Sequence, residues 1–105
     1  MRAVISWWDL NSSGQTIESL RSDLLAHGVE EWKNVPGLRL KLWISDDSTN
    51  RWGAVMLWDD DAGTTTVMPA NRAAQRIGYP ATVRLEARVE ATAQAQSSST
   101  DGRPL

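Results

Sequence analysis

Two runs of alternating residues, joined by a polar turn, constrain the fold of this chain more than any other feature. In residues 38–44 the side chains alternate with the period of two that is typical of a β-strand. In residues 52–58 both alternating sets are apolar, and the turn cluster SDDSTN lies between the two runs. We therefore predict a β-hairpin. The apolar face of its first strand carries Leu38, Leu40, Leu42 and Ile44, and the opposite face carries Arg39, Lys41 and Trp43. One face of its second strand carries Trp52, Ala54, Met56 and Trp58.

Four further segments complete the predicted order of elements. Arg2–Trp8 is rich in β-branched and aromatic residues and indicates a strand, and Thr16–Lys33 has helical spacing. The segment Pro69–Pro80 is typical of a short helix that starts at its proline and ends at Gly78. Thr82–Ala91 alternates again and indicates a last strand. The order β-α-β-β-α-β predicts an α+β, ferredoxin-like domain with one antiparallel sheet, helices on one face and the other face open in a monomer.

The apolar sets of the helix and of the last strand predict where the core lies. At 100° per residue one arc of the first helix carries Ile17, Leu20, Leu24, Leu25 and Trp32. Gly28 falls near the middle of this arc, so we predict that its Cα packs closely on the sheet. In the last strand we expect Val83, Leu85, Ala87 and Val89 to point inward and Arg84, Glu86, Arg88 and Glu90 to point outward.

Length and composition limit the class of protein. The 105 residues predict one domain over residues 1–91, followed by a tail over residues 92–105 whose Ala, Gln, Ser, Thr, Gly and Pro content predicts disorder. A net charge of −2 gives no basic surface for nucleic acid, and no apolar run is long enough to cross a membrane. The absence of Cys and of an apparent leader predicts a cytoplasmic protein. No second His stands with a carboxylate at ligand spacing, so we predict no metal site.

Three stretches resemble a known family. The segments GVEEWKNVPGLRLKLWIS, RWGAVMLWDD and MPANRAAQRIGYPATVR are similar to the YdhR-like monooxygenase family of the dimeric α+β barrel (antibiotic biosynthesis monooxygenase) superfamily. The resemblance covers about Arg2 to Ala91, and its marks are the Pro-Gly before the second strand and Trp58-Asp59 at the end of the third. It implies a homodimer in which two sheets meet face to face, with a pocket in each subunit between sheet and helices.

The resemblance also implies an activity. It predicts a cofactor-independent monooxygenase, or a related tailoring enzyme, that acts on an aromatic or polyketide-like small molecule. Trp58 stands where anthrone-oxidising relatives hold and activate their substrate with a Trp. Those relatives have an Asn four residues earlier, where this chain has Ala54. This difference favours the alternative function, a small-molecule binding protein of the same fold without turnover. A structural dimer with a packed interior is a third alternative.

The candidate site follows from these predictions. We expect Trp58 to act in catalysis or to form a core or pocket wall. His27 is the one side chain whose unperturbed pKa lies near neutrality, and it is either a general base or an exposed residue on the flank of the helix. Asn71 and Arg72 lie either at the mouth of the pocket or on a solvated helix face. The predicted ligand pocket consists of Trp52, Ala54, Met56, Trp58, Asn71 and Arg72.

Overall fold

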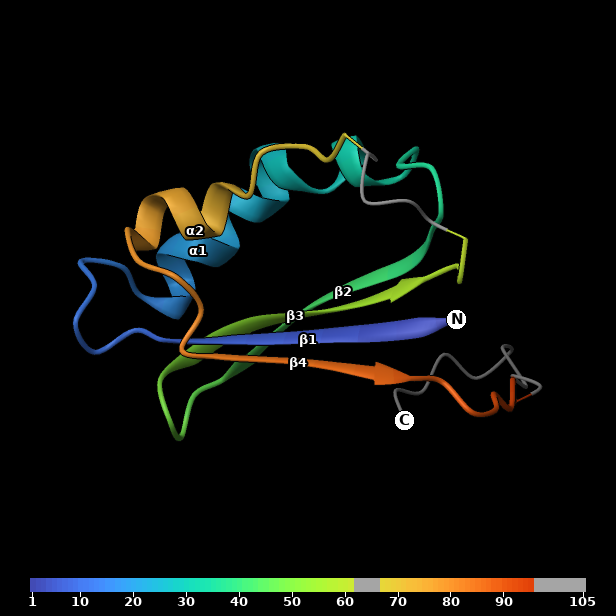
Figure 1. The fold of residues 1–105 in the computed structure, drawn as a ribbon. Helices are drawn as coiled ribbons and strands as arrows, with labels where there is room; N and C mark the ends of the chain where they lie inside the picture. Colours follow the sequence, from blue (N-terminus) through green and yellow to red (C-terminus); the bar gives the residue numbers. More distant parts are fainter. Residues whose placement is uncertain (62–66, 96–105) are drawn as a thin grey trace.

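The chain forms one four-stranded antiparallel sheet with helical segments on one face (Figure 1). The computed structural model describes residues 1–61 and 67–95. Its elements are β1 (Arg2–Asp9), α1 (Ile17–Asp23), β2 (Leu38–Asp46), β3 (Arg51–Trp58), α2 (Arg72–Ile77) and β4 (Val83–Arg88). The strand order is β2-β3-β1-β4. A βαββαβ chain with this order is compatible with the predicted ferredoxin-like fold.

The predicted strands and hairpin are confirmed, whereas both helices are shorter than predicted. Asp46 pairs with Arg51 across the hairpin, and the register runs from there along both strands. α2 begins at Arg72 rather than at Pro69, because the side chain of Asn71 accepts a hydrogen bond from the backbone N–H of Ala74 and caps the helix there. The helix ends as predicted at Gly78, whose φ of 91° lies in the left-handed region.

The predicted helix over Thr16–Lys33 is divided into three parts. α1 is followed by a π-helical turn, Leu24–Gly28, and then by a short 3₁₀ turn, Glu30–Trp32. A π turn accommodates one more residue than an α turn, so the residues beyond it no longer lie where a 3.6-residue period puts them. The prediction that Leu25 faces the core is therefore wrong: this side chain is 74% exposed.

The helix-side face of the sheet carries the core, which forms two clusters. The first cluster lies under α1 and α2 and contains Trp8, Leu10, Ile17, Leu20, Trp52 and Ile77. The second lies farther along the sheet and contains Val4, Trp32, Val35 and Trp58. Trp43 packs against both clusters. Five of the six tryptophans therefore lie on the helix side, and four of them, Trp8, Trp32, Trp52 and Trp58, are buried there.

The opposite face of the sheet is apolar as well, and no described segment covers it. Cross-strand pairing puts the following side chains together on this face: Ala3, Ile5, Trp7, Leu40, Leu42, Ile44, Val55, Leu57, Val83, Leu85 and Ala87. Leu40, Leu42 and Leu85 are each about half exposed. We call this surface the open face. The prediction that the apolar residues of β4 point into the core is wrong, because its helix-side positions are occupied by Arg84, Glu86 and Arg88.

A bulge in β2 divides its predicted apolar set. Leu38 pairs with Trp58, whereas Leu40 pairs with Leu57, so one extra residue lies between them. Leu38 consequently packs on the second core cluster, while Leu40 lies on the open face. The extra residue, Arg39, forms an ion pair with Asp59 at 3.0 Å.

Parts of the predicted domain division lie outside the described residues. Residues 92–95 contain no helix or strand, and 96–105 are not described, so the predicted disordered tail stays a prediction. Within 1–61 and 67–95, no helix is both long and apolar enough to cross a membrane.

The two buried glycines, Gly28 and Gly53, differ in what surrounds them. A Cβ on Gly53 would collide with the backbone oxygen of Ser6 and with the ring of Trp7, which lies across this glycine on the open face. A Cβ on Gly28 would lie 3.0 Å from Leu24 Cδ1, the end of a flexible side chain. All three nearest atoms belong to Leu24, so the predicted close packing of Gly28 on the sheet is wrong.

We expect the two glycines to respond differently to alanine. Gly53→Ala should lower the free energy of unfolding by about 1–3 kcal/mol, because backbone and a large ring would have to move. Gly28→Ala should change it by less than about 1 kcal/mol, since alanine favours helical backbone and Leu24 can rotate. Urea unfolding of both variants measures the difference, and equal effects would contradict this account.

Candidate functional site

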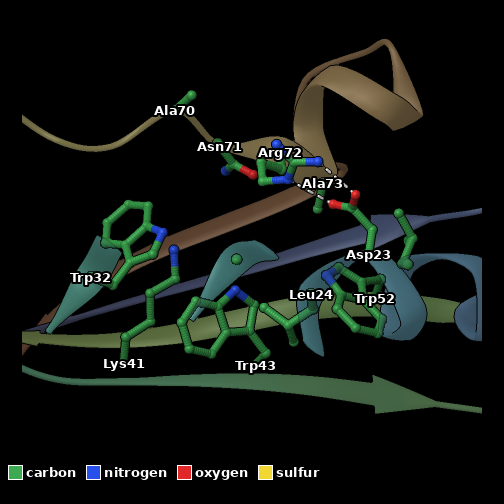
Figure 2. A pocket seen from close by; sticks show the side chains of 12 residues that line it. Asp23, Leu24, Trp32, Lys41, Trp43, Trp52, Ala70, Asn71, Arg72 and Ala73 are labelled. Atoms are coloured by element: carbon green, nitrogen blue, oxygen red, sulfur yellow. Dashed lines mark hydrogen bonds and ion pairs between the residues drawn. The ribbon is translucent and has the colours of Figure 1, made fainter. Parts of the chain in front are cut away.

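A small cavity lies between the sheet and the helical layer (Figure 2). Its volume of about 20 Å³ is enough for roughly one water molecule. The sheet contributes Lys41, Trp43 and Trp52, and α1 with the turns that follow it contributes Leu20, Asp23, Leu24, Gly28 and Trp32. The start of α2 covers the other side with Ala70, Asn71, Arg72 and Ala73. The cavity therefore lies where four separate segments of the chain meet.

An open groove adjoins this cavity along β2. It has a volume of about 310 Å³, close to the lower limit of ordinary small-molecule sites. Its lining residues are Val29, Trp32, Lys33, Leu38, Arg39, Leu40, Lys41 and Trp43. Trp32, Lys41 and Trp43 line both the groove and the cavity. We call these three residues the indole-lysine site.

Lys41 holds its ammonium group between two indole rings. Its Nζ lies 3.2 Å from the centre of the Trp32 ring and 4.9 Å from that of Trp43. Figure 2 shows the side chain rising from β2 between the two tryptophans. Within residues 1–61 and 67–95 no carboxylate forms an ion pair with this lysine. The faces of the rings are the groups that compensate its charge.

Burial changes the acid–base behaviour of Lys41. Loss of solvent around its amine lowers the pKa of Lys41 to about 8, from an ordinary value of 10.5. The two indole faces act in the opposite direction, since they favour the cation. Proteins that use a lysine amine as a base or a nucleophile commonly bury it in this way, without a carboxylate partner.

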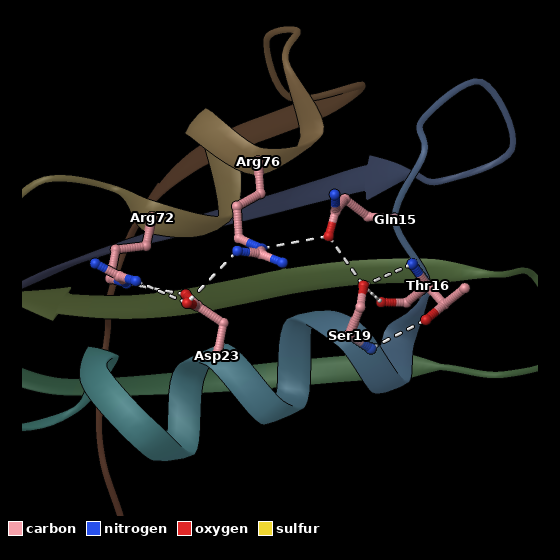
Figure 3. Close-up of polar contacts among 6 residues, drawn as sticks. All are labelled: Gln15, Thr16, Ser19, Asp23, Arg72 and Arg76. Atoms are coloured by element: carbon pink, nitrogen blue, oxygen red, sulfur yellow. Dashed lines mark hydrogen bonds and ion pairs between the residues drawn. The ribbon is translucent and has the colours of Figure 1, made fainter.

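A polar network joins α2 to α1 above the cavity (Figure 3). Arg72 donates two hydrogen bonds to the carboxylate of Asp23, at 2.9 and 2.7 Å, and only 10% of the Asp23 side chain is exposed. The hydrogen bond from Arg72 lowers the pKa of Asp23, against the effect of burial. Arg76 lies 3.7 Å from the same carboxylate and also donates to Gln15. This bidentate pairing holds the first turn of α2 in a fixed position over the cavity.

The π-helical turn shapes the cavity from the other side. Leu24 and Gly28, its first and last residues, both line the cavity. Gly28 has no side chain to occupy the space that the wide turn leaves. Turns of this kind are rare and occur frequently at functional sites.

The structure brings together three of the residues predicted for the ligand pocket and separates the others from them. Trp52, Asn71 and Arg72 line the cavity, although Asn71 Oδ1 caps α2 and Arg72 is paired with Asp23. Ala54, Met56 and Trp58 share the helix-side face with Trp52, as their period of two requires, but line neither the cavity nor the groove.

The two residues predicted for catalysis lie away from the cavity and the groove. Trp58 is 5% exposed and belongs to the same core cluster as Trp32. His27 is exposed on the π-helical turn and lines neither space.

The indole-lysine site was not among the predicted site residues. The sequence did indicate two of its three residues, because the hairpin turn pairs Trp43 with Ala54 and so places Lys41 and Trp43 on the same face as Trp52. The helical period placed Trp32 on the arc that faces the core, and Trp32 is buried as predicted, but the period did not indicate that it lies beside Lys41.

Comparison with known proteins adds no identification. No protein-family model matches the sequence, and no curated protein is similar enough to count as a relative. In residues 1–61 and 67–95, no three His, Cys, Asp or Glu side chains lie close enough together to hold a metal ion.

The lowered pKa of Lys41 predicts a pH-dependent stability. Between pH 8 and pH 10.5 the unfolded chain binds more protons than the folded one, so stability rises with pH in this window. Below pH 8 Lys41 is charged in the folded protein, and the cost of burying this charge lowers the free energy of unfolding in full. Lys41→Met should therefore raise the free energy of unfolding at pH 7 by about 1 kcal/mol, allowing for partial solvent screening. This gain should shrink as the pH rises from 8 to 10.

Chemical denaturation at several pH values measures this effect. Lys33→Met is the matched control, because it removes an exposed lysine from the same groove. The free energies of unfolding of Lys41→Met and of the parent protein are compared from pH 7 to pH 10. If their difference stays constant over this range, the burial of the Lys41 charge is contradicted.

Proposed function

We propose that the protein binds a flat aromatic small molecule, of the phenolic or polyketide kind, in the groove beside the indole-lysine site. The observation that carries this proposal is the position of Lys41 Nζ between Trp32 and Trp43, where the groove meets the cavity. Indole rings stack on aromatic ligands, and an amine beside them pairs with an acidic hydroxyl group. The groove joins apolar and indole side chains to the basic groups of Lys33, Arg39 and Lys41, and small-molecule sites commonly combine apolar walls with a few polar groups.

Cofactor-independent monooxygenation, which the family resemblance implies, is the second candidate function. The lowered pKa of Lys41 favours it, because removing a proton from a substrate requires a base whose pKa lies near the working pH. Trp58, the residue that the resemblance assigns to catalysis, would act from behind Trp32 in the second core cluster.

We propose, finally, that the working unit is a homodimer in which the open face of one chain covers that of a second copy. Leucines on both edge strands support this, since Leu40, Leu42 and Leu85 are about half exposed on a surface that is apolar across all four strands. A two-fold dimer uses the same surface on both chains, so one apolar face is sufficient for it. Stable interfaces bury at least about 1,200 Å².

We expect 2-naphthol, a flat phenol, to bind with a measurable heat in titration calorimetry. Trp43→Ala should weaken the binding about 3- to 10-fold, because it removes one stacking surface. Trp7→Phe is the matched control, since this indole lies on the opposite face of the sheet. Equal affinities of the Trp43→Ala variant and the parent protein would contradict binding in the groove.

Oxygen uptake with anthrone as substrate distinguishes the two candidate functions. Uptake that is lost in both Trp58→Phe and Lys41→Met would support the monooxygenase. Binding of anthrone without oxygen uptake would support the binding protein.

For the dimer we expect light scattering to give twice the 11.6 kDa of one chain. Leu42→Glu should shift the mass toward that of a monomer, because it puts a charge on the apolar open face. Leu25→Glu is the control, since Leu25 is 74% exposed but lies on the helical layer. A monomeric parent protein at micromolar concentration would contradict the proposal.

A further inference from the structure

The amine of Lys41 can act as a nucleophile as well as pair with an acidic group of a ligand. Of the two lysines in the chain, Lys33 is exposed and paired with Glu30 at 2.8 Å, whereas Lys41 is partly buried against two indole rings. No carboxylate in the described segments pairs with Lys41, so no ion pair holds its amine in the protonated form. A neutral amine has a free electron pair and is a nucleophile.

Geometry places this amine where an electrophile can reach it. Lys41 lines the open groove of about 310 Å³ as well as the smaller cavity, so a ligand lying in the groove contacts its side chain. Trp32 and Trp43 flank the same position and provide flat apolar surfaces on which an aromatic ring can stack. The groove therefore favours ligands that join an aromatic ring directly to an electrophilic carbon.

We infer that Lys41 forms a Schiff base with flat aromatic aldehydes and ketones that enter the groove, an inference that rests on the groove being the ligand site proposed above. The amine nitrogen attacks the carbonyl carbon and forms a carbinolamine. Both amine protons pass through solvent to the carbonyl oxygen, the C–O bond breaks, and one water leaves as the C=N bond forms. No oxidant or reductant takes part in this condensation.

The fraction of neutral amine supports the inference independently of the geometry. With a pKa of about 8, Lys41 is substantially neutral near pH 8. An ordinary solvated lysine has a pKa near 10.4, so at pH 8 on the order of one lysine side chain in several hundred is neutral. Even after allowance for the weaker nucleophilicity of a less basic amine, Lys41 should react faster than an ordinary lysine.

Reductive trapping tests the inference on the parent protein, without any variant. The protein is incubated at pH 7.5 with 2-naphthaldehyde and cyanoborohydride, which reduces an imine to a stable secondary amine, and the adducts are located by peptide mass spectrometry. We expect modification of Lys41 at least about tenfold faster than that of Lys33, which borders the same groove. The N-terminal amine lies on a separate peptide and is counted apart. Equal or faster modification of Lys33 would overturn the inference.

A variant and a second ligand separate this inference from the proposed function. Lys41→Arg keeps a cation between the rings but has no reactive amine, so it should lose the fast adduct. Binding of 2-naphthol, which has no carbonyl group, is measured on the parent protein and reports on the groove alone. Binding of 2-naphthol to the parent protein without preferential modification of Lys41 would overturn the Schiff base and leave the groove as a binding site. If 2-naphthol does not bind and Lys41 is not modified, both proposals are wrong.

Discussion

A single constraint underlies the structure: the sheet has two apolar faces, and residues 1–61 and 67–95 form one layer of helices, which covers one of them (Figure 1). β1 and β3, the central strands, carry apolar residues on both faces. The edge strands β2 and β4 put Leu40, Leu42 and Leu85 on the open face, and they put Lys41, Arg84, Glu86 and Arg88 on the helix side. An antiparallel sheet with one solvated face normally has the reverse arrangement, with polar residues turned away from the helices. The helical layer therefore covers a face that contains charged groups, and Lys41 is one of them.

The position of the candidate site follows from this arrangement. Lys41 lies on the helix side of β2 and lines the cavity under the helical layer, where water is partly excluded and its pKa falls. Trp32 and Trp43 supply the ring faces that a buried cation requires in the absence of a carboxylate. The bidentate pair of Arg72 and Asp23 then fixes α2 over the cavity without directing a carboxylate to Lys41. The indole rings thus stabilise the charge of Lys41, whereas the pair of Arg72 and Asp23 holds the helix that covers the cavity.

The sequence predicted the topology well and the site only in part. Period-two alternation in β2, β3 and β4 and the positions of Gly78 and the hairpin turn were sufficient for the βαββαβ order. Alternation cannot say which of two faces meets the helices, so the apolar set of β4 was assigned to the wrong side. Leu25 was misplaced because a π turn changes the angular position of its residues, and Gly28 is buried as its position on the arc predicted but packs on Leu24 rather than on the sheet. The groove beside Lys41 depends on the same turn, through Trp32, and could not be predicted from periodicity.

The hairpin turn between β2 and β3 determines which residues of β2 form the site and which form the open face. Asp46 accepts hydrogen bonds from both the backbone N–H and the hydroxyl of Ser48, and Asn50 adopts a left-handed conformation with φ 53°. Asparagine tolerates this conformation better than most residues, and its side-chain amide also donates to Asn11. Together these contacts fix the pairing of Asp46 with Arg51 and hence that of Trp43 with Ala54. A slip of one residue would exchange the two faces of the strand and turn Lys41 and Trp43 away from the helices. The chemistry available at the groove therefore depends on a four-residue turn at the far end of the strand.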